Sequence, residues 1–185
     1  MSMMKLAATL LASLLSIVSF AQAQTYSMLH TFTGGHDGSH SVSGLVIDHA
    51  GNLYGTTSAG GNTQGVCVNG GCGTVFRISP KNGAWIFTTL YAFQGGEDGA
   101  APQAALTIGP DGALYGTTLY GGGLGCSSGY GCGTVFKVTP PPTFCGSALC
   151  GWKETVIFSF PEQGMNGIST PYGGVVFDPA GHPGL

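Results

Sequence analysis

The chain has 185 residues, of which only 7% are charged, and its formal net charge at pH 7 is −3. An average globular protein has roughly a quarter of its residues charged, and disordered chains combine high charge with few large apolar residues, so extended disorder is not expected. The five Lys and Arg residues form no basic cluster that could neutralise a phosphate backbone. Nucleic acid is therefore excluded as an expected partner.

Residues 1–23 have the pattern of an export signal. Lys5 precedes the almost wholly apolar run 6–20, and Ala21-Gln22-Ala23 supplies small residues around a cleavage point. The apolar run is shorter than the roughly twenty residues of a transmembrane helix. We therefore predict a removable signal helix, a mature domain over 24–185 without a membrane span, and a location outside the cytoplasm, either secreted or at the cell surface.

The mature part is a tandem repeat. The motif Leu-Tyr-Gly-Thr-Thr at 53–57 recurs at 114–118, and Gly-Thr-Val-Phe at 73–76 recurs at 133–136. The offsets of 61 and 60 residues define a unit of about sixty residues, which has room for four short strands. The expected units are about 26–85, 86–152 and an incomplete 153–185.

Each unit divides into four predicted strands by its apolar alternation and its turn residues. They are an aromatic strand at 26–32, 88–93 and 155–160, a strand before a turn at 44–48, 105–109 and 174–178, the Leu-Tyr-Gly-Thr-Thr strand, and the Gly-Thr-Val-Phe strand. No stretch carries a helical period. The predicted fold is all-β, built from tandem four-stranded antiparallel units, and it is β-propeller-like, with two blades and a truncated third.

The third unit stops early. After the turn at 179–181 the pattern requires another Leu-Tyr-Gly-Thr-Thr, but the sequence continues as His182-Pro183-Gly184-Leu185. A propeller usually needs at least about four blades, so we expect a fragment of a longer product, an assembly of several chains, or an open stack. An open blade edge would also favour self-association. The glycine of Leu-Tyr-Gly-Thr-Thr is expected to meet a neighbouring backbone or to mark a β-bulge.

These motifs resemble a known repeat. Leu-Tyr-Gly-Thr-Thr, the Gly-Gly loops at 60–61 and 121–122, Gly-Thr-Val-Phe, and an aromatic strand followed by Gly-Gly-x-Asp-Gly are similar to the GloVer (Gloeobacter and Verrucomicrobia) repeat over about 26–181. The resemblance is to choice-of-anchor tandem repeat GloVer-containing proteins. It implies an exported, propeller-like bacterial protein, usually with more repeats and often with a C-terminal sorting anchor. That anchor pattern is missing here, so we expect a further C-terminal part. The resemblance implies no catalytic residues.

Six cysteines in an exported chain predict disulfides. Their spacing is local, and two of the pairs end directly before Gly-Thr-Val-Phe. Zinc is the alternative, but these spacings are looser than those of most structural zinc sites. The expected pairs are Cys67 with Cys72, Cys126 with Cys132, and Cys145 with Cys150.

An acidic residue recurs in one loop of successive units. Asp37 and Asp98 follow Gly-Gly in the first two units, and Asn166 stands at this place in the third. Hard oxygen ligands make Asp37 and Asp98 candidates for calcium. The favoured alternative is that each side chain accepts hydrogen bonds from its own turn. No cofactor is otherwise predicted.

Two further sets of side chains have a structural and a functional interpretation. His30, His36 and His40 lie close to Asp37 and could form a transition-metal site, although His30 occupies an aromatic strand position that favours a structural role. Trp85 and Trp152 align between units and could stack on sugars, but packing between blades is the commoner use of such residues.

The segment 125–129 matches the hydrolase pattern Gly-x-Ser-x-Gly around Ser127. Because no strand-to-helix turn is expected there, the match is interpreted as accidental, and no catalytic residue is predicted. The leading hypothesis is an exported, non-catalytic scaffold or binding protein whose loops contact carbohydrate or a surface protein. The alternatives are an extracellular polysaccharide-active enzyme with carboxylates from several blades, and a truncated gene remnant.

Overall fold

The structure is a computed structural model, and it describes residues 26–67, 69–123, 125, 130–142, 150–161 and 171–184. The strands in these residues are β1 (Val46–Ile47), β2 (Leu53–Thr57), β3 (Thr74–Lys81), β4 (Ala84–Ala92), β5 (Ala100–Pro102), β6 (Thr107–Ile108), β7 (Leu114–Tyr120), β8 (Thr134–Thr139), β9 (Lys153–Ser159), β10 (Val176–Phe177) and β11 (Pro183–Gly184). A short 3₁₀ helix, η2, spans Gly65–Cys67. The predicted all-β fold is confirmed. The predicted signal helix at 1–23 lies outside the described residues.

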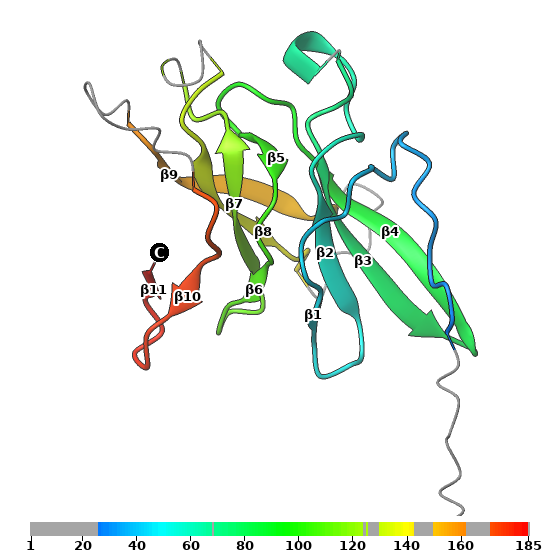
Figure 1. The fold of residues 1–185 in the computed structure, drawn as a ribbon. Coiled ribbons are helices and arrows are strands. Elements are labelled where there is room, and N and C mark those ends of the chain that lie inside the picture. The colour runs from blue at the N-terminus through cyan, green and yellow to red at the C-terminus, as the bar shows by residue number, and fades with distance from the viewer. Residues whose placement is uncertain are drawn as a thin grey trace, which may run out of the picture.

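The strands form successive antiparallel sheets. The first sheet has the order β1-β2-β3-β4, and the second has the order β5-β7-β8-β9, with β6 also paired to β7. Strands β10 and β11 form a separate hairpin. Figure 1 shows the hairpin, the second sheet and the first sheet in a row. Tandem antiparallel units are thus present, and the described residues form no closed propeller or barrel.

The sheets are offset from the sequence units. The aromatic segments at 88–93 and 155–160 fall within or at the end of β4 and β9, which pair with β3 and β8 as the last strands of their sheets. The prediction of a strand at 26–32 is wrong, since this segment belongs to no strand. The physical reason is that β4 and β9 each follow a strand with which they pair, whereas no described strand precedes 26–32.

The glycine of the Leu-Tyr-Gly-Thr-Thr motif lies against an aromatic ring. Gly55 is paired with Phe76 in the register of β2 and β3, and a Cβ at Gly55 would lie 2.6 Å from Phe76 Cζ and 2.7 Å from Leu45 Cδ2. Gly116 and Phe136 repeat the arrangement in β7 and β8. The expectation of a neighbouring backbone or a bulge at this glycine is therefore wrong. The register irregularities lie between β3 and β4 and between β8 and β9.

In each sheet, a pair of buried threonines links two neighbouring strands, β2 with β3 and β7 with β8. The hydroxyl groups of Thr57 and Thr74 are 2.8 Å apart, and those of Thr118 and Thr134 are 2.7 Å apart. In each pair the first threonine also accepts the backbone N–H of the second. All four side chains are fully buried, so these hydrogen bonds satisfy groups that water cannot reach. The threonines of the two motifs are thus structural.

The main hydrophobic core lies between the two sheets. Its buried residues are Tyr54, Cys67, Cys72, Val75, Leu90 and Phe93 from the first sheet and its loops, and Leu106, Leu114, Phe136 and Val138 from the second sheet and its loops. A smaller cluster joins the second sheet to the β10–β11 hairpin through Ala113, Tyr115, Val135 and Val175. Successive repeats therefore stack face to face, and each sheet buries its apolar face against its neighbour.

The predicted bond between Cys67 and Cys72 is confirmed. Cys132 and Cys150 are also disulfide-bonded. Cys126 and Cys145 lie outside the described residues, as do Ser127 and Asn166, so the predictions for these positions stay predictions.

Candidate ligand-binding cleft

A cleft of about 660 Å³ opens where the loops of the two units meet. Its walls are the η2 loop with the Cys67–Cys72 disulfide, the loop after β4 with Glu97, the end of β7 with Tyr120, and Tyr130 from the segment before β8. This end of the molecule carries η2, at the top of Figure 1. We call it the interloop cleft. It borders the main core, because Cys67 and Cys72 belong to both.

Glycines allow the loops at the cleft to approach each other closely. Gly121 has a φ of 92°, and a Cβ there would lie 2.3 Å from Gly99 Cα. Gly71, with a φ of 83°, meets the backbone of Gly60 in the same way. Residues with a side chain could not adopt these conformations at such distances without strain. Gly71 and Gly121 both line the cleft, so these close backbone contacts shape its wall.

The disulfide fixes a further part of the cleft wall. Cys67 and Cys72 are both buried, and a Cβ at Gly95 would lie 3.0 Å from Cys72 Sγ and 3.3 Å from Cys67 Sγ. Gly95 opens the loop that carries Glu97, so the disulfide packs against this loop as well as against the core. The wall is therefore held by a covalent link and by close packing.

Two tyrosines and one carboxylate provide the chemistry of the cleft. The rings of Tyr120 and Tyr130 have centroids 6.1 Å apart and are inclined by 54°, and Tyr130 is 67% exposed. Glu97 is exposed at the same cleft. Concave sites with an apolar lining and a few polar groups are the usual form of small-molecule sites. An aromatic face beside a carboxylate suits a polar ligand that also has an apolar face.

A second cleft, of about 680 Å³, lies at the opposite end, between the β1–β2 turn and the β6–β7 turn. Its carboxylate, Asp48, accepts hydrogen bonds from Asn52 and from the Tyr54 hydroxyl. Burial acts to raise the pKa of Asp48, but these hydrogen bonds outweigh it and hold the pKa below its usual value. The carboxylate is occupied by its own turn, so this cleft is the weaker candidate.

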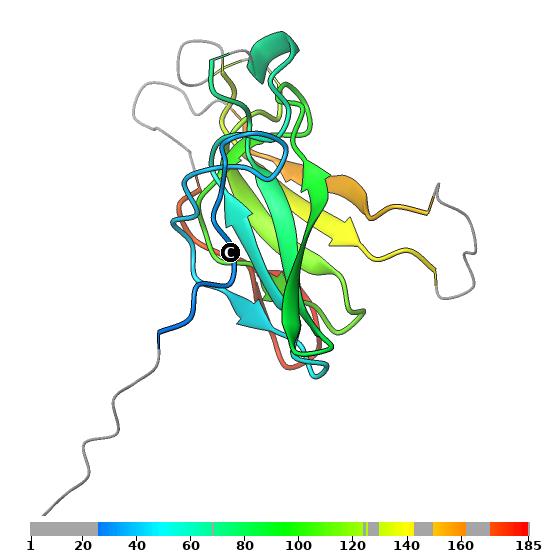
Figure 2. The ribbon, with the colours of Figure 1, turned by 90° about the vertical axis from the view of Figure 1, so that its right-hand side faces the viewer.

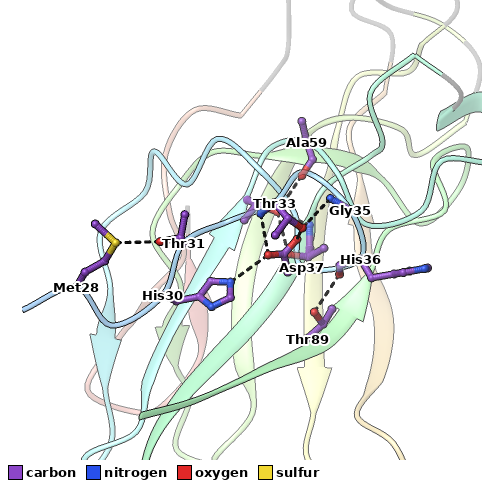
Figure 3. A network of polar contacts seen from close by, with 11 residues as sticks. Met28, His30, Thr31, Thr33, Gly35, His36, Asp37, Ala59 and Thr89 are labelled. Carbon is purple, nitrogen blue, oxygen red and sulfur yellow. Dashed lines mark hydrogen bonds and ion pairs between the residues drawn. The ribbon is translucent and has the colours of Figure 1, made fainter. Parts of the chain in front are cut away.

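The first calcium candidate, Asp37, accepts hydrogen bonds within its own loop. Its carboxylate accepts the Thr33 N–H at 2.9 Å and the Thr33 hydroxyl at 2.6 Å, and it lies 3.1 Å from His30 Nε2 (Figure 3). Burial acts to raise the pKa of Asp37, and the hydrogen bonds from Thr33 and His30 lower it below its usual value. This geometry matches the predicted turn interpretation, and calcium binding at Asp37 stays a prediction.

His30 contacts Asp37, but the three histidines predicted as a cluster do not lie together. The side chain of His36 points away from Asp37, while its backbone carbonyl accepts the Thr89 hydroxyl (Figure 3). His40 lies beside Ser39. Among the residues that the structure describes, no group of three or more His, Cys, Asp or Glu side chains could hold a metal ion.

The second calcium candidate, Asp98, lies beside an acid that the sequence did not single out. Asp98 accepts the Gln94 N–H and the Tyr91 hydroxyl, and its pKa is raised, chiefly by burial. Glu154 of β9 is half-buried, and burial together with the charge of Asp98 raises its pKa to about 7. One oxygen of each carboxyl is buried without a hydrogen-bond partner among the described residues. Asp98 lies in the loop between β4 and β5 and Glu154 lies in β9, far along the sequence, so the sequence carried no signal for the pair.

The two tryptophans have different surroundings. Trp152 packs against the main core, with its ring centroid 6.1 Å from that of Tyr54 in the other sheet. Packing between units is thus confirmed for Trp152. Trp85 is 40% exposed on the first sheet.

Stacked antiparallel sheets of equivalent sequence define an all-β tandem-repeat protein. The sequence matches the family model of the Gloeobacter/Verrucomicrobia repeat over residues 16–182. The chain therefore belongs to this repeat family, as its motifs predicted. No curated protein matches the chain. In the described part of the chain, no helix has the length and hydropathy needed to cross a membrane, and the disulfide is compatible with a compartment outside the cytoplasm.

Proposed function

We propose that the chain is an exported, non-catalytic repeat protein of the bacterial cell surface that binds carbohydrate in the interloop cleft. The observation that carries the proposal is the exposed Tyr130 beside Tyr120, facing the same cleft as Glu97. The signal-like sequence at 1–23, the disulfide and the repeat family support a role outside the cytoplasm. We further propose that the units are blades of a propeller-like stack, because consecutive sheets pack face to face.

Each part of the cleft has a task in this proposal. A tyrosine ring packs on the apolar C–H face of a sugar, and Glu97 accepts hydrogen bonds from sugar hydroxyl groups. Backbone groups of the glycine-rich loops add short-range polar contacts. Because the disulfide and the close glycine contacts hold the loops in place, little conformational entropy is lost on binding.

The test is direct binding of a panel of soluble polysaccharides to the purified chain, by affinity electrophoresis and calorimetry. Tyr130→Ala removes the exposed ring, and we expect the affinity to fall by roughly tenfold, the value of one aromatic contact. Tyr172→Ala is the matched control, since Tyr172 is 68% exposed and does not line the cleft. Binding that is unchanged in Tyr130→Ala, or lost equally in both variants, would refute the proposed site.

A polysaccharide-active enzyme is the second candidate, and the Asp98–Glu154 pair favours it. Glycoside hydrolysis uses two carboxyl groups of different pKa, and the raised pKa of Glu154 would suit a general acid near neutral pH. Against it, Asp98 is hydrogen-bonded to Tyr91, and Glu154 lines none of the clefts described above. Hydrolysis of any polysaccharide by the chain, abolished by Glu154→Gln with folding retained, would replace the binding proposal.

A further inference from the structure

The interloop cleft carries an acidic side chain that no basic side chain of its lining balances. Glu97 is exposed at the cleft, and none of the described lining residues is Lys, Arg or His. Outside the predicted signal, the chain has four Lys and Arg residues, and all of them lie in described strands: Arg77, Lys81, Lys137 and Lys153. Because none of the four lines the cleft, the charge of Glu97 is left to face solvent or a ligand.

Basic side chains lie toward the other end of the molecule. Strand β3 begins at Thr74, two residues after Cys72 of the cleft wall, and it ends at Lys81. Figure 2 shows η2 at the top and the β3–β4 turn at the bottom. Lys137 forms an ion pair with Asp111 of the β6–β7 turn, which borders the opposite cleft. This separation of charges gives the interloop cleft a negative potential.

A smaller cleft of about 400 Å³ adjoins the interloop cleft and has a second acid in its lining. The two clefts share Glu97 and Gly123, so Glu97 stands between them. Asp98 lines the smaller cleft, and no described lining residue there is basic. One oxygen of Asp98 accepts the Tyr91 hydroxyl and the Gln94 N–H, whereas the other is buried without a partner among the described residues. The aromatic pair is therefore followed by two acids along connected clefts.

We propose that the two connected clefts bind an amino-sugar polymer, a carbohydrate whose rings carry free ammonium groups. The inference rests on the carbohydrate binding proposed above and narrows it to one class of sugar. An ammonium group donates charge-assisted hydrogen bonds to the Glu97 carboxylate, and the electron-rich face of Tyr130 attracts it. The apolar face of a sugar ring packs on a tyrosine ring, and a following ring of the polymer brings its ammonium group toward Asp98. A neutral sugar supplies no charge for either acid.

The test compares two soluble hexamers by calorimetry at about pH 5.5, where amines are protonated and ordinary carboxyl groups are ionised. One is β-1,4-linked glucosamine, and the other is its fully N-acetylated form, which has no ammonium group. The chain should bind the glucosamine hexamer at least about tenfold more tightly. Glu97→Gln should weaken this binding by about fivefold, the value of one exposed ion pair, and leave the N-acetylated hexamer unaffected. Asp178→Asn is the control, since it removes an exposed charge that lines neither cleft.

The outcomes separate this inference from the function on which it rests. If the chain binds both hexamers equally, or if Asp178→Asn weakens binding as much as Glu97→Gln does, the amino-sugar inference is wrong and the carbohydrate site stands. If neither hexamer binds but another polysaccharide does, again only this inference fails. If no carbohydrate binds, both fail. A lysine hexamer carries ammonium groups without sugar rings, so its binding as tightly as the glucosamine hexamer would assign the clefts to cationic peptides and overturn the inference.

Discussion

The ring of Phe136 occupies the space that a side chain at Gly116 would need. A Cβ at Gly116 would lie 2.6 Å from Phe136 Cζ, and Phe76 stands in the same relation to Gly55. Each phenylalanine is the cross-strand partner of its glycine in the sheet register. The two sequence motifs of the repeat are therefore two halves of one contact: the glycine provides the space, and the aromatic ring fills it and shields the backbone.

The first prediction follows from this contact. Gly116→Ala should destabilise the fold by about 1–3 kcal/mol, because the added methyl group forces the Phe136 ring and Leu106 to move within a packed core. Urea denaturation followed by fluorescence measures the change. Gly173→Ala is the control, since a Cβ there has no atom within 4 Å. An equal loss in both variants would show that glycine content, and not the contact with Phe136, matters.

The second prediction concerns the buried threonine pair. Thr118→Val keeps the shape of the side chain but removes the hydroxyl that donates to the Tyr120 carbonyl and accepts the Thr134 N–H. The loss should be about 1–3 kcal/mol, since buried polar groups lose their partners. Thr155→Val on the exposed side of β9 should change the stability by less than about 0.5 kcal/mol. Similar stability of Thr118→Val and the wild type would contradict a structural role for the motif.

The third prediction is a pH dependence from Glu154. Its pKa is about 7 in the folded state against an ordinary value of 4.5, so the folded state binds more protons than the unfolded state between these values. Stability therefore falls as the pH rises through this window, and the burial cost of the charge is complete above it. Glu154→Gln should be more stable than the wild type at about pH 8, by roughly 1 kcal/mol after allowance for solvent screening at a half-exposed site.

At about pH 4 both proteins carry a neutral side chain at position 154, so their melting temperatures should converge. This convergence is the internal control. An advantage of Glu154→Gln that is the same at both pH values would mean that packing, and not the charge beside Asp98, sets the difference.

The sequence predicted the strands that recur within each repeat, but it did not predict the contacts between residues of different repeats. The motif spacing predicted the strands that became β2, β3, β7 and β8, and local spacing predicted the Cys67–Cys72 bond. It could not pair Glu154 with Asp98, because Asp98 lies in the loop between β4 and β5, Glu154 lies in β9, and only the folded chain brings them together. The strand expected at 26–32 failed for a related reason: its aromatic pattern is that of β4, but a strand also needs a neighbour with which to pair.

The sequence also did not predict the interloop cleft, because the residues that line it come from different units. Tyr120 and Tyr130 lie in the second unit and the disulfide lies in the first, so no single motif contains the site. The signal that could have found it is the position of the motifs: the Gly-Gly pairs at 60–61 and 121–122 and the cysteines Cys67, Cys72 and Cys132 all lie between a Leu-Tyr-Gly-Thr-Thr strand and the next Gly-Thr-Val-Phe strand. Loops at one end of stacked sheets converge even when their sequences are far apart.

The fourth prediction tests the covalent wall of the cleft. Cys67→Ser combined with Cys72→Ser should lower the stability by about 2 kcal/mol, because the short loop between them gains freedom in the unfolded state. The change should also weaken ligand binding in the cleft, since the disulfide supports the loop that carries Glu97. Thermal unfolding and the polysaccharide binding assay measure the two effects. Wild-type binding with lowered stability would show that the loop keeps its place without the bond.

The fifth prediction uses a strained residue at the edge of the cleft. Ala101 in β5 has a φ of 53°, and its counterpart His40 has a φ of 57°, a region that side chains disfavour. Ala101→Gly removes the strain and should stabilise the fold by about 0.5–1 kcal/mol, less the small entropy cost of a glycine in the unfolded chain. The neighbouring Ala100 is not among the described residues with a positive φ, so Ala100→Gly should instead destabilise by a similar amount. Opposite signs in urea denaturation would confirm that the left-handed conformation of Ala101 is strained, and equal signs would contradict it.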